Sequence, residues 1–238
     1  MYTYMTSKQL KDSARHRLSV AGSTPIAGTA LLYGLLFALS AFVTGLTISP
    51  TTLEVSPLYY AGSFLITVFS GILSGGFCYM MLKMYCGHPI GIGDLLYAFT
   101  HRGGKLLSVS IWLGILSFLL EFPIDVLSAR FTSSLSMYDG ALFFFVTTVC
   151  MLLLILFDIY FALVSYLAIE YPHYSTLRIF SLSVHLMKGH KGRLFYITVS
   201  FLPLMLLGIC TCGILFLWII PLMQAVYTEF YLDIITHK

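Results

Sequence analysis

The residue best placed to do chemistry is Asp158, which interrupts the apolar segment LFDIY at residues 156–160. It precedes Glu170 by 12 residues, which is about 18 Å along a helix and places it near the middle of a bilayer. A carboxylate there costs on the order of 2.5–3.5 kcal/mol, so it should face protein or water. Asp158 can be a proton or cation site, or a protonated or hydrogen-bonded packing residue. We favour packing, because no intramembrane basic partner accompanies it.

A second pair of acids, Glu121 and Asp125, lies near the end of another apolar segment. Their spacing puts both carboxylates on one helix face, where they can attract a cation. Acids in this position more commonly mark the boundary with water, and we favour that interpretation. Together with Asp158 they are the candidate intramembrane polar site.

The histidines and cysteines do not form a metal-binding pattern. No two histidines have a tight ligand spacing such as HxxxH, and Cys210 and Cys212 have no other soft ligand nearby in the sequence. Phosphate-loop, GxSxG, HExxH and dinucleotide motifs are also absent from the sequence. We therefore expect no metal, no cofactor and a non-enzymatic protein. The histidines are His16, His88, His101, His173, His185, His190 and His237.

Basic residues gather between the apolar segments. Residues 6–20, 90–101 and 175–188 can each form a short amphipathic helix, and Ser175 and Gly189 would cap the third. Basic amphipathic helices lie on anionic leaflets, either as anchors, which we favour, or as lipid-handling elements. The candidate lipid head-group or partner contacts are Lys11, Arg15, Arg17, Arg102, Lys105, Lys188, Lys191 and Arg193.

The composition identifies the elements that must position these residues. The chain has 238 residues, of which 58% are hydrophobic and 10% charged, too few charges to cover a water-facing surface. In lipid, a helix forms the hydrogen bonds of its own backbone N–H and C=O groups. We therefore predict an all-α polytopic membrane protein with six transmembrane helices in one domain. The spans are expected at about 25–48, 58–82, 106–128, 140–168, 194–210 and 213–232, after a basic cytoplasmic segment at 1–24.

The last two predicted spans form an unusual stretch. No charged residue occurs from Leu194 to Thr228, which is 35 residues, too long for one ordinary span and short for two. Pro203, Pro221 and Gly213 interrupt it, and these residues favour a helical hairpin. The hairpin either crosses the membrane or dips into it without crossing.

The basic residues also predict the orientation. Twelve of the thirteen, all except Arg130, fall on one side of the predicted spans. The positive-inside rule assigns that side to the cytoplasm, so both termini are expected there. Each short amphipathic segment precedes a pair of spans, which raises the hypothesis of three repeated units, each a helix plus a hairpin. The alternative is that linkers entering a span are generally basic and then apolar.

Faces of small residues run along two predicted spans, formed by Gly34, Ala38, Ala41 and Gly45 in the first and by Thr67, Gly71 and Gly75 in the second. Such faces let helix backbones approach closely. We expect them to pack within one molecule, with dimerisation as the alternative.

The last third of the chain resembles a known pattern. The matching segments are AIEYP (168–172), SVHLMKGHKGRLF (183–195), SF (200–201), TCGI (211–214), LWIIP (217–221) and FY (230–231). They resemble the bacterial integral membrane family catalogued as domain of unknown function 975, which is distantly similar to the membrane domain accompanying some glycerophosphodiester phosphodiesterases. The resemblance implies a bacterial plasma-membrane protein and supplies no catalytic or ligand residues.

These features favour a non-enzymatic accessory, scaffold or regulator that acts through protein partners or lipids. The expected partners are anionic lipids of the cytoplasmic leaflet and a membrane protein or second copy of the chain, with no nucleic acid. The alternative is a small transporter or channel for a lipid or small solute, with Asp158 in the path, because broken helices build transport sites. A membrane-embedded enzyme is a third alternative.

Overall fold

The computed structural model describes residues 4–47, 57–100, 103–134, 136–211 and 213–237, and all regular structure in them is helical. The elements are α1 (Ser7–Ala21), α2 (Thr24–Thr47), α3 (Pro57–Tyr85), the 3₁₀ helix η1 (Ile92–Phe99), α4 (Gly104–Ser134), α5 (Met137–Phe161), α6 (Val164–Glu170), α7 (Thr176–Leu186), α8 (Lys191–Val199), α9 (Leu202–Cys210) and α10 (Phe216–Thr236). The predicted all-α fold is confirmed.

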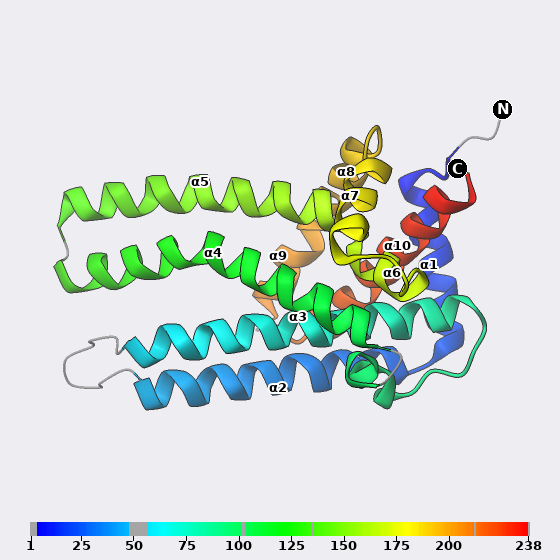
Figure 1. Cartoon of the computed structure of the whole chain (residues 1–238), viewed down its shortest axis with the longest axis horizontal. Helices are drawn as coiled ribbons and strands as arrows, with labels where there is room; N and C mark the ends of the chain where they lie inside the picture. Colours follow the sequence, from blue (N-terminus) through cyan, green and yellow to red (C-terminus); the bar gives the residue numbers. More distant parts are fainter. Residues whose placement is uncertain (1–3, 48–56, 101–102, 135, 212, 238) are drawn as a thin grey trace.

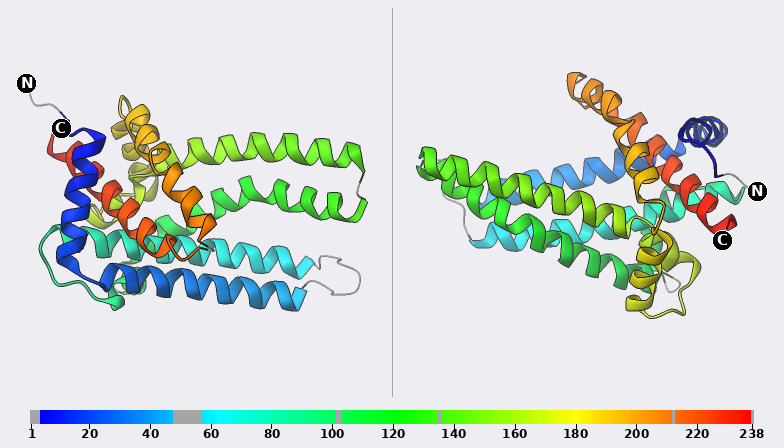
Figure 2. Two further views of the ribbon diagram at one scale, coloured as in Figure 1. Left: turned by 180° about the vertical axis from the view of Figure 1, so that it is seen from behind. Right: turned by 90° about the horizontal axis from the view of Figure 1, so that it is seen from above.

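Two long helical hairpins, α2–α3 and α4–α5, lie side by side and give the molecule its length (Figure 1). The short helices gather at one end of these hairpins. There α1 runs crosswise to the long helices and packs along α10 (Figure 2). The two ends of the chain also lie at this end of the hairpins (Figure 1).

Five helical segments are long and apolar enough to cross a membrane: Thr24–Leu46, Leu58–Tyr85, Gly104–Ser128, Met137–Glu170 and Lys191–Cys210. The first three each correspond to one predicted span. The fourth continues from α5 into α6 through a break at Ala162 and Leu163, and the fifth combines α8 and α9. The coarse prediction of several apolar spans is therefore confirmed.

The sixth predicted span falls on α10, which is not among these five segments. Glu229 and Asp233 lie within this helix, and its second half is largely buried against the rest of the protein. The turn between α9 and α10 stops well short of the far ends of the two long hairpins (Figure 1, Figure 2). Within the described residues, five candidate spans are found where the sequence predicted six.

The three predicted short helices are present as α1, η1 and α7. The Ser175 side chain accepts a hydrogen bond from the Arg178 backbone N–H at 3.3 Å, and Gly189 has a φ of 88°, as their predicted capping roles require. The element order follows the hypothesis of three helix-plus-hairpin units. The third hairpin is shorter and bent, however, because Ser200 and Phe201 separate α8 from α9.

The helix α3 is the central span. Half of its apolar window is buried, whereas no other candidate span exceeds 22%. Its small residues explain this position: a Cβ on Gly71 would lie 3.3 Å from the Ser110 carbonyl oxygen of α4, and one on Gly75 would lie 2.9 Å from the Leu106 side chain. The small face of the second predicted span thus packs within the molecule, as expected.

The small face of the first predicted span behaves differently. Gly34 and Gly45 have no described atom within 4 Å of a hypothetical Cβ, and Ala38 and Ala41 are exposed. The described residues of the chain therefore do not cover this face of α2, contrary to the expectation of packing within one molecule.

Gly76 is the position where close backbone contact is most demanding. An added Cβ would lie 1.9 Å from the carbonyl oxygen of Leu95, so α3 and η1 can pack this closely only without a side chain. We predict that Gly76→Ala lowers stability by about 1–3 kcal/mol, because η1 must move away from α3. Thermal unfolding of the purified protein in detergent measures the change.

Gly34→Ala is the matched control, because nothing lies within 4 Å of its Cβ position. Alanine favours the helix over glycine, so the control should be unchanged or slightly more stable. Equal melting temperatures for Gly76→Ala and the wild type would contradict the close approach.

Candidate functional site

Asp158 lies on α5 between two cavities and lines both of them. The larger cavity has a volume of about 510 Å³ and the smaller about 210 Å³. The Asp158 residue, which lines both cavities, is exposed. Among the described residues, no hydrogen bond or ion pair reaches its carboxylate, and neither cavity has a Lys, Arg or His in its described lining. The predicted intramembrane acid therefore faces accessible space rather than a packed, hydrogen-bonded helix.

The larger cavity lies between α3, α5 and the bent hairpin of α8, α9 and α10. One wall carries a polar cluster centred on Gln224, whose Nε2 donates to the Tyr166 hydroxyl at 2.8 Å and contacts the Cys78 Sγ at 3.0 Å. The Tyr166 hydroxyl in turn pairs with the Thr228 hydroxyl at 3.1 Å. These bonds fix the orientation of the amide, so the cavity has a defined polar patch.

The remaining wall of the larger cavity is mostly apolar. Leu202 and Met205 of α9 face Ile155 of α5 across it. Thr198 and Tyr227 add a second polar pair, with their hydroxyl oxygens 3.0 Å apart. The cavity can thus hold a molecule with an apolar body and one polar end, which would lie near Gln224 or Asp158.

The smaller cavity separates α3, α4 and α5. Ser70 and Ser117 line it, but their hydroxyls donate to carbonyls of their own helices, Thr67 at 2.8 Å and Gly114 at 3.1 Å. Asp158 is the one charged residue among its described lining residues. Ala162, the residue that follows α5, also lines both cavities, so Asp158 and Ala162 are common to the two linings.

Other predicted chemical residues lie away from these cavities. Glu121 and Asp125 are half-buried on α4 and line neither cavity, although the Glu121 carboxylate is near enough to those of Asp125 and Asp158 for their charges to interact. Within the described residues, no group of three or more His, Cys, Asp or Glu side chains could hold a metal ion. Arg102 and Cys212 lie outside the described residues.

Several predicted head-group contacts are used inside the protein. Lys11 lies 4.5 Å from the centre of the Phe201 ring, and Lys191 lies 3.7 Å from that of Tyr160. Burial, and then the charge of Arg15, lower the pKa of Lys11. Arg15 and Lys188 are exposed and Lys105 is half-buried.

Arg193 makes the most buried of the ionic contacts. Its Nη2 donates to the carboxylate of Asp233 and, at 2.7 Å, to the backbone carbonyl of Met5. The Asp233 side chain is 2% exposed and that of Arg193 is 19% exposed. Arg193 therefore joins the chain's N-terminal segment, α8 and α10. Its position in the sequence did not predict this structural role.

The polar cluster was missed by sequence reasoning. The sequence pattern did not predict a role for Tyr166, Gln224 or Thr228. The available signal was Gln224, because an amide inside a charge-free stretch of a membrane protein needs a hydrogen-bond partner. Identifying Tyr166 as that partner requires the fold, since the two residues are 58 positions apart.

The fold and the cavities define the class: an α-helical protein with several candidate membrane spans and, between them, a mostly apolar hollow with one polar patch. The chain belongs to the family described as Protein of unknown function (DUF975), whose sequence pattern matches residues 1–238. The resemblance seen in the last third thus extends over the whole chain. No curated protein and no solved structure matches the chain.

The buried ion pair gives a prediction. Asp233→Asn leaves the Arg193 guanidinium buried without a counter-charge, so the protein should lose about 3–5 kcal/mol of stability. Thermal unfolding of the full chain in detergent checks this. Asp12→Asn is the control, because Asp12 pairs with Arg15 at 3.8 Å with both side chains more than half exposed, and such pairs contribute little. Similar melting temperatures for the two variants would argue against the structural role of Arg193.

Proposed function

We propose that this protein is a non-enzymatic membrane protein that binds a lipid or another small amphipathic molecule in the larger cavity. Through that molecule it would act as an accessory or regulatory component of the membrane. The observation that carries the proposal is the 510 Å³ hollow with an apolar wall and a fixed polar patch at Gln224. Its size lies within the roughly 300–1,000 Å³ typical of small-molecule sites.

The chemistry of the lining supports an amphipathic ligand. Leu202, Met205 and Ile155 offer apolar surface, and Tyr166 and Gln224 offer hydroxyl and amide groups. The polar groups are already oriented by their own hydrogen bonds, so binding a polar end would cost little reordering. A fully polar solute would leave the apolar wall unmatched.

A small transporter is the second candidate, and Asp158 favours it. Its carboxylate is accessible from the cavities on both flanks of α5. Charged residues within spans that face cavities commonly mark substrate or ion pathways. The interrupted helices α8 and α9 also resemble the broken helices that build transport sites.

The binding proposal predicts that filling the cavity displaces its ligand. Ala162 lines both cavities, so Ala162→Leu places extra carbon atoms in the shared space. Wild-type protein, extracted with its native lipids and analysed by mass spectrometry, should carry one enriched small molecule. Ala162→Leu should retain several-fold less of it.

Ala141→Leu is the matched control, because Ala141 is exposed on α5, the helix that ends just before Ala162, and lines neither cavity. It should keep the bound molecule. Absence of any enriched small molecule from the wild type, or equal loss from both variants, would refute the binding proposal.

Uptake by Asp158→Asn separates the two candidates. The substitution removes the charge while nearly preserving the size of the side chain. Binding by the apolar wall predicts that the variant retains the copurifying molecule. Transport predicts that retention persists but uptake of that molecule into reconstituted vesicles falls at least tenfold. Lys188→Glu, at an exposed position, is the control for a change of charge; its uptake should match the wild type. Full uptake by Asp158→Asn would reject a transport role for this carboxylate.

A further inference from the structure

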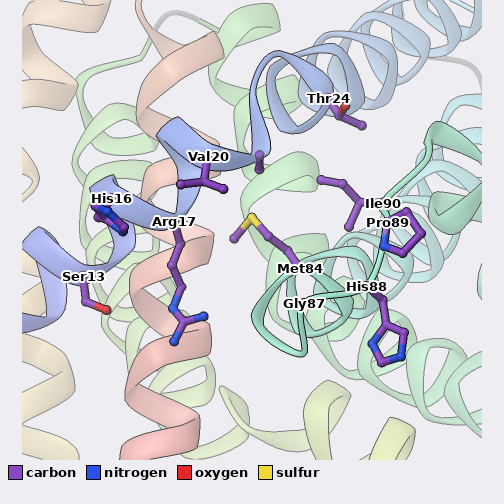
Figure 3. A pocket seen from close by; sticks show the side chains of 11 residues that line it. Ser13, His16, Arg17, Val20, Thr24, Met84, Gly87, His88, Pro89 and Ile90 are labelled. Carbon is purple, nitrogen blue, oxygen red and sulfur yellow. The ribbon is translucent and has the colours of Figure 1, made fainter.

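A separate pocket of about 880 Å³ lies at the end of the bundle where α1 meets the end of α3. Figure 3 shows its two sides: Ser13, His16 and Arg17 project from α1, and His88, Pro89 and Ile90 come from the loop after α3, with Met84 between them. None of these residues lines the central cavities. The pocket is therefore a distinct hollow of the molecule.

The ionisable side chains of the pocket are basic. Arg17, His16 and His88 line it, and no Asp or Glu occurs among its described lining residues. Both histidines are exposed, so their ring nitrogens are accessible to a ligand. They come from opposite sides of the hollow, and an anion inside it would have basic groups on two sides.

Arg17 retains part of its hydrogen-bonding capacity. Its Nε lies 3.9 Å from the Glu229 carboxylate, and its Nη1 donates to the Tyr85 carbonyl at 3.4 Å. The guanidinium also lies 4.5 Å from the centre of the Tyr85 ring, which holds it in place. Among the described residues, no hydrogen-bond partner contacts Nη2. Glu229 offsets part of the positive charge, so the histidines are needed for net attraction of an anion.

The pocket also offers apolar surface. The Val20 side chain is 77% exposed at its edge, and Met84 and Ile90 lie along the wall. Thr24 begins α2 and Met84 belongs to the last turn of α3, so the pocket lies where two candidate spans end. Lipid head groups are found at this level of a membrane, with acyl chains extending alongside the spans.

We propose that this pocket binds the phosphate-bearing head group of an anionic membrane lipid. Arg17, His16 and His88 would attract the phosphate, because guanidinium and imidazolium groups form charge-assisted hydrogen bonds with phosphate oxygens. Val20, Met84 and Ile90 would contact the first carbons below the head group. The apolar edge favours a lipid over free phosphate, which has no apolar part. This inference does not depend on the central cavity.

The test is native mass spectrometry of the full chain in detergent, titrated with phosphatidylglycerol or phosphatidylcholine. The double variant His16→Ala/His88→Ala removes the two exposed basic groups that make no structural ion pair. We expect phosphatidylglycerol to bind the wild type more tightly than phosphatidylcholine. The variant should bind phosphatidylglycerol roughly fivefold more weakly, the effect of about one surface charge.

The matched control is His173→Ala/His185→Ala, which removes two exposed histidines outside the pocket and should bind as the wild type does. Equal weakening by both double variants, or equal affinity for the two lipids, would overturn the proposal. Displacement of phosphatidylglycerol by millimolar inorganic phosphate would overturn the lipid assignment and identify free phosphate as the ligand of the pocket. Thermal unfolding confirms that both variants remain folded.

Discussion

The buried carboxylate of Asp233 is the constraint on which the end of the molecule depends. An acid that is 2% exposed must be compensated by a cation, and Arg193 supplies it from the start of α8. The same guanidinium donates to the carbonyl of Met5, and Met5 N–H lies 3.5 Å from the Asp233 carboxylate. One ionic contact thereby joins the N-terminal segment, α8 and α10. It also holds α1 across the end of the bundle.

The arrangement of α8, α9 and α10 explains why a cavity forms beside α5. The long hairpins pack closely because glycines of α3 admit the backbone and side chains of α4. The last hairpin bends at Ser200 and Phe201 and turns back before reaching the far end of the bundle (Figure 1). Space is left between its bend and α5, and the polar side chains of α6 and α10 satisfy one another at the edge of that space.

The two kinds of hollow differ in their chemistry, and their positions explain the difference. The central cavities lie among candidate spans, where a cation would be costly, and their linings contain one carboxylate and several neutral polar groups. The pocket at the end of the bundle has histidine and arginine around an apolar edge, a combination suited to the boundary between head groups and acyl chains. Under the two proposals, the protein would contact lipid at two depths.

The sequence by itself determined the helical class, the apolar segments and the short helices, because these follow from hydropathy, helix caps and breakers that act over a few residues. It also identified Asp158 as the unusual residue, since an acid in an apolar segment is visible without a fold. The tertiary structure decided which polar groups meet, Arg193 with Asp233 and Gln224 with Tyr166, and it placed Arg17 and His88 in the lining of one pocket. These partners are far apart in the chain, and only the packing of α1, α3, α8 and α10 at one end brings them together.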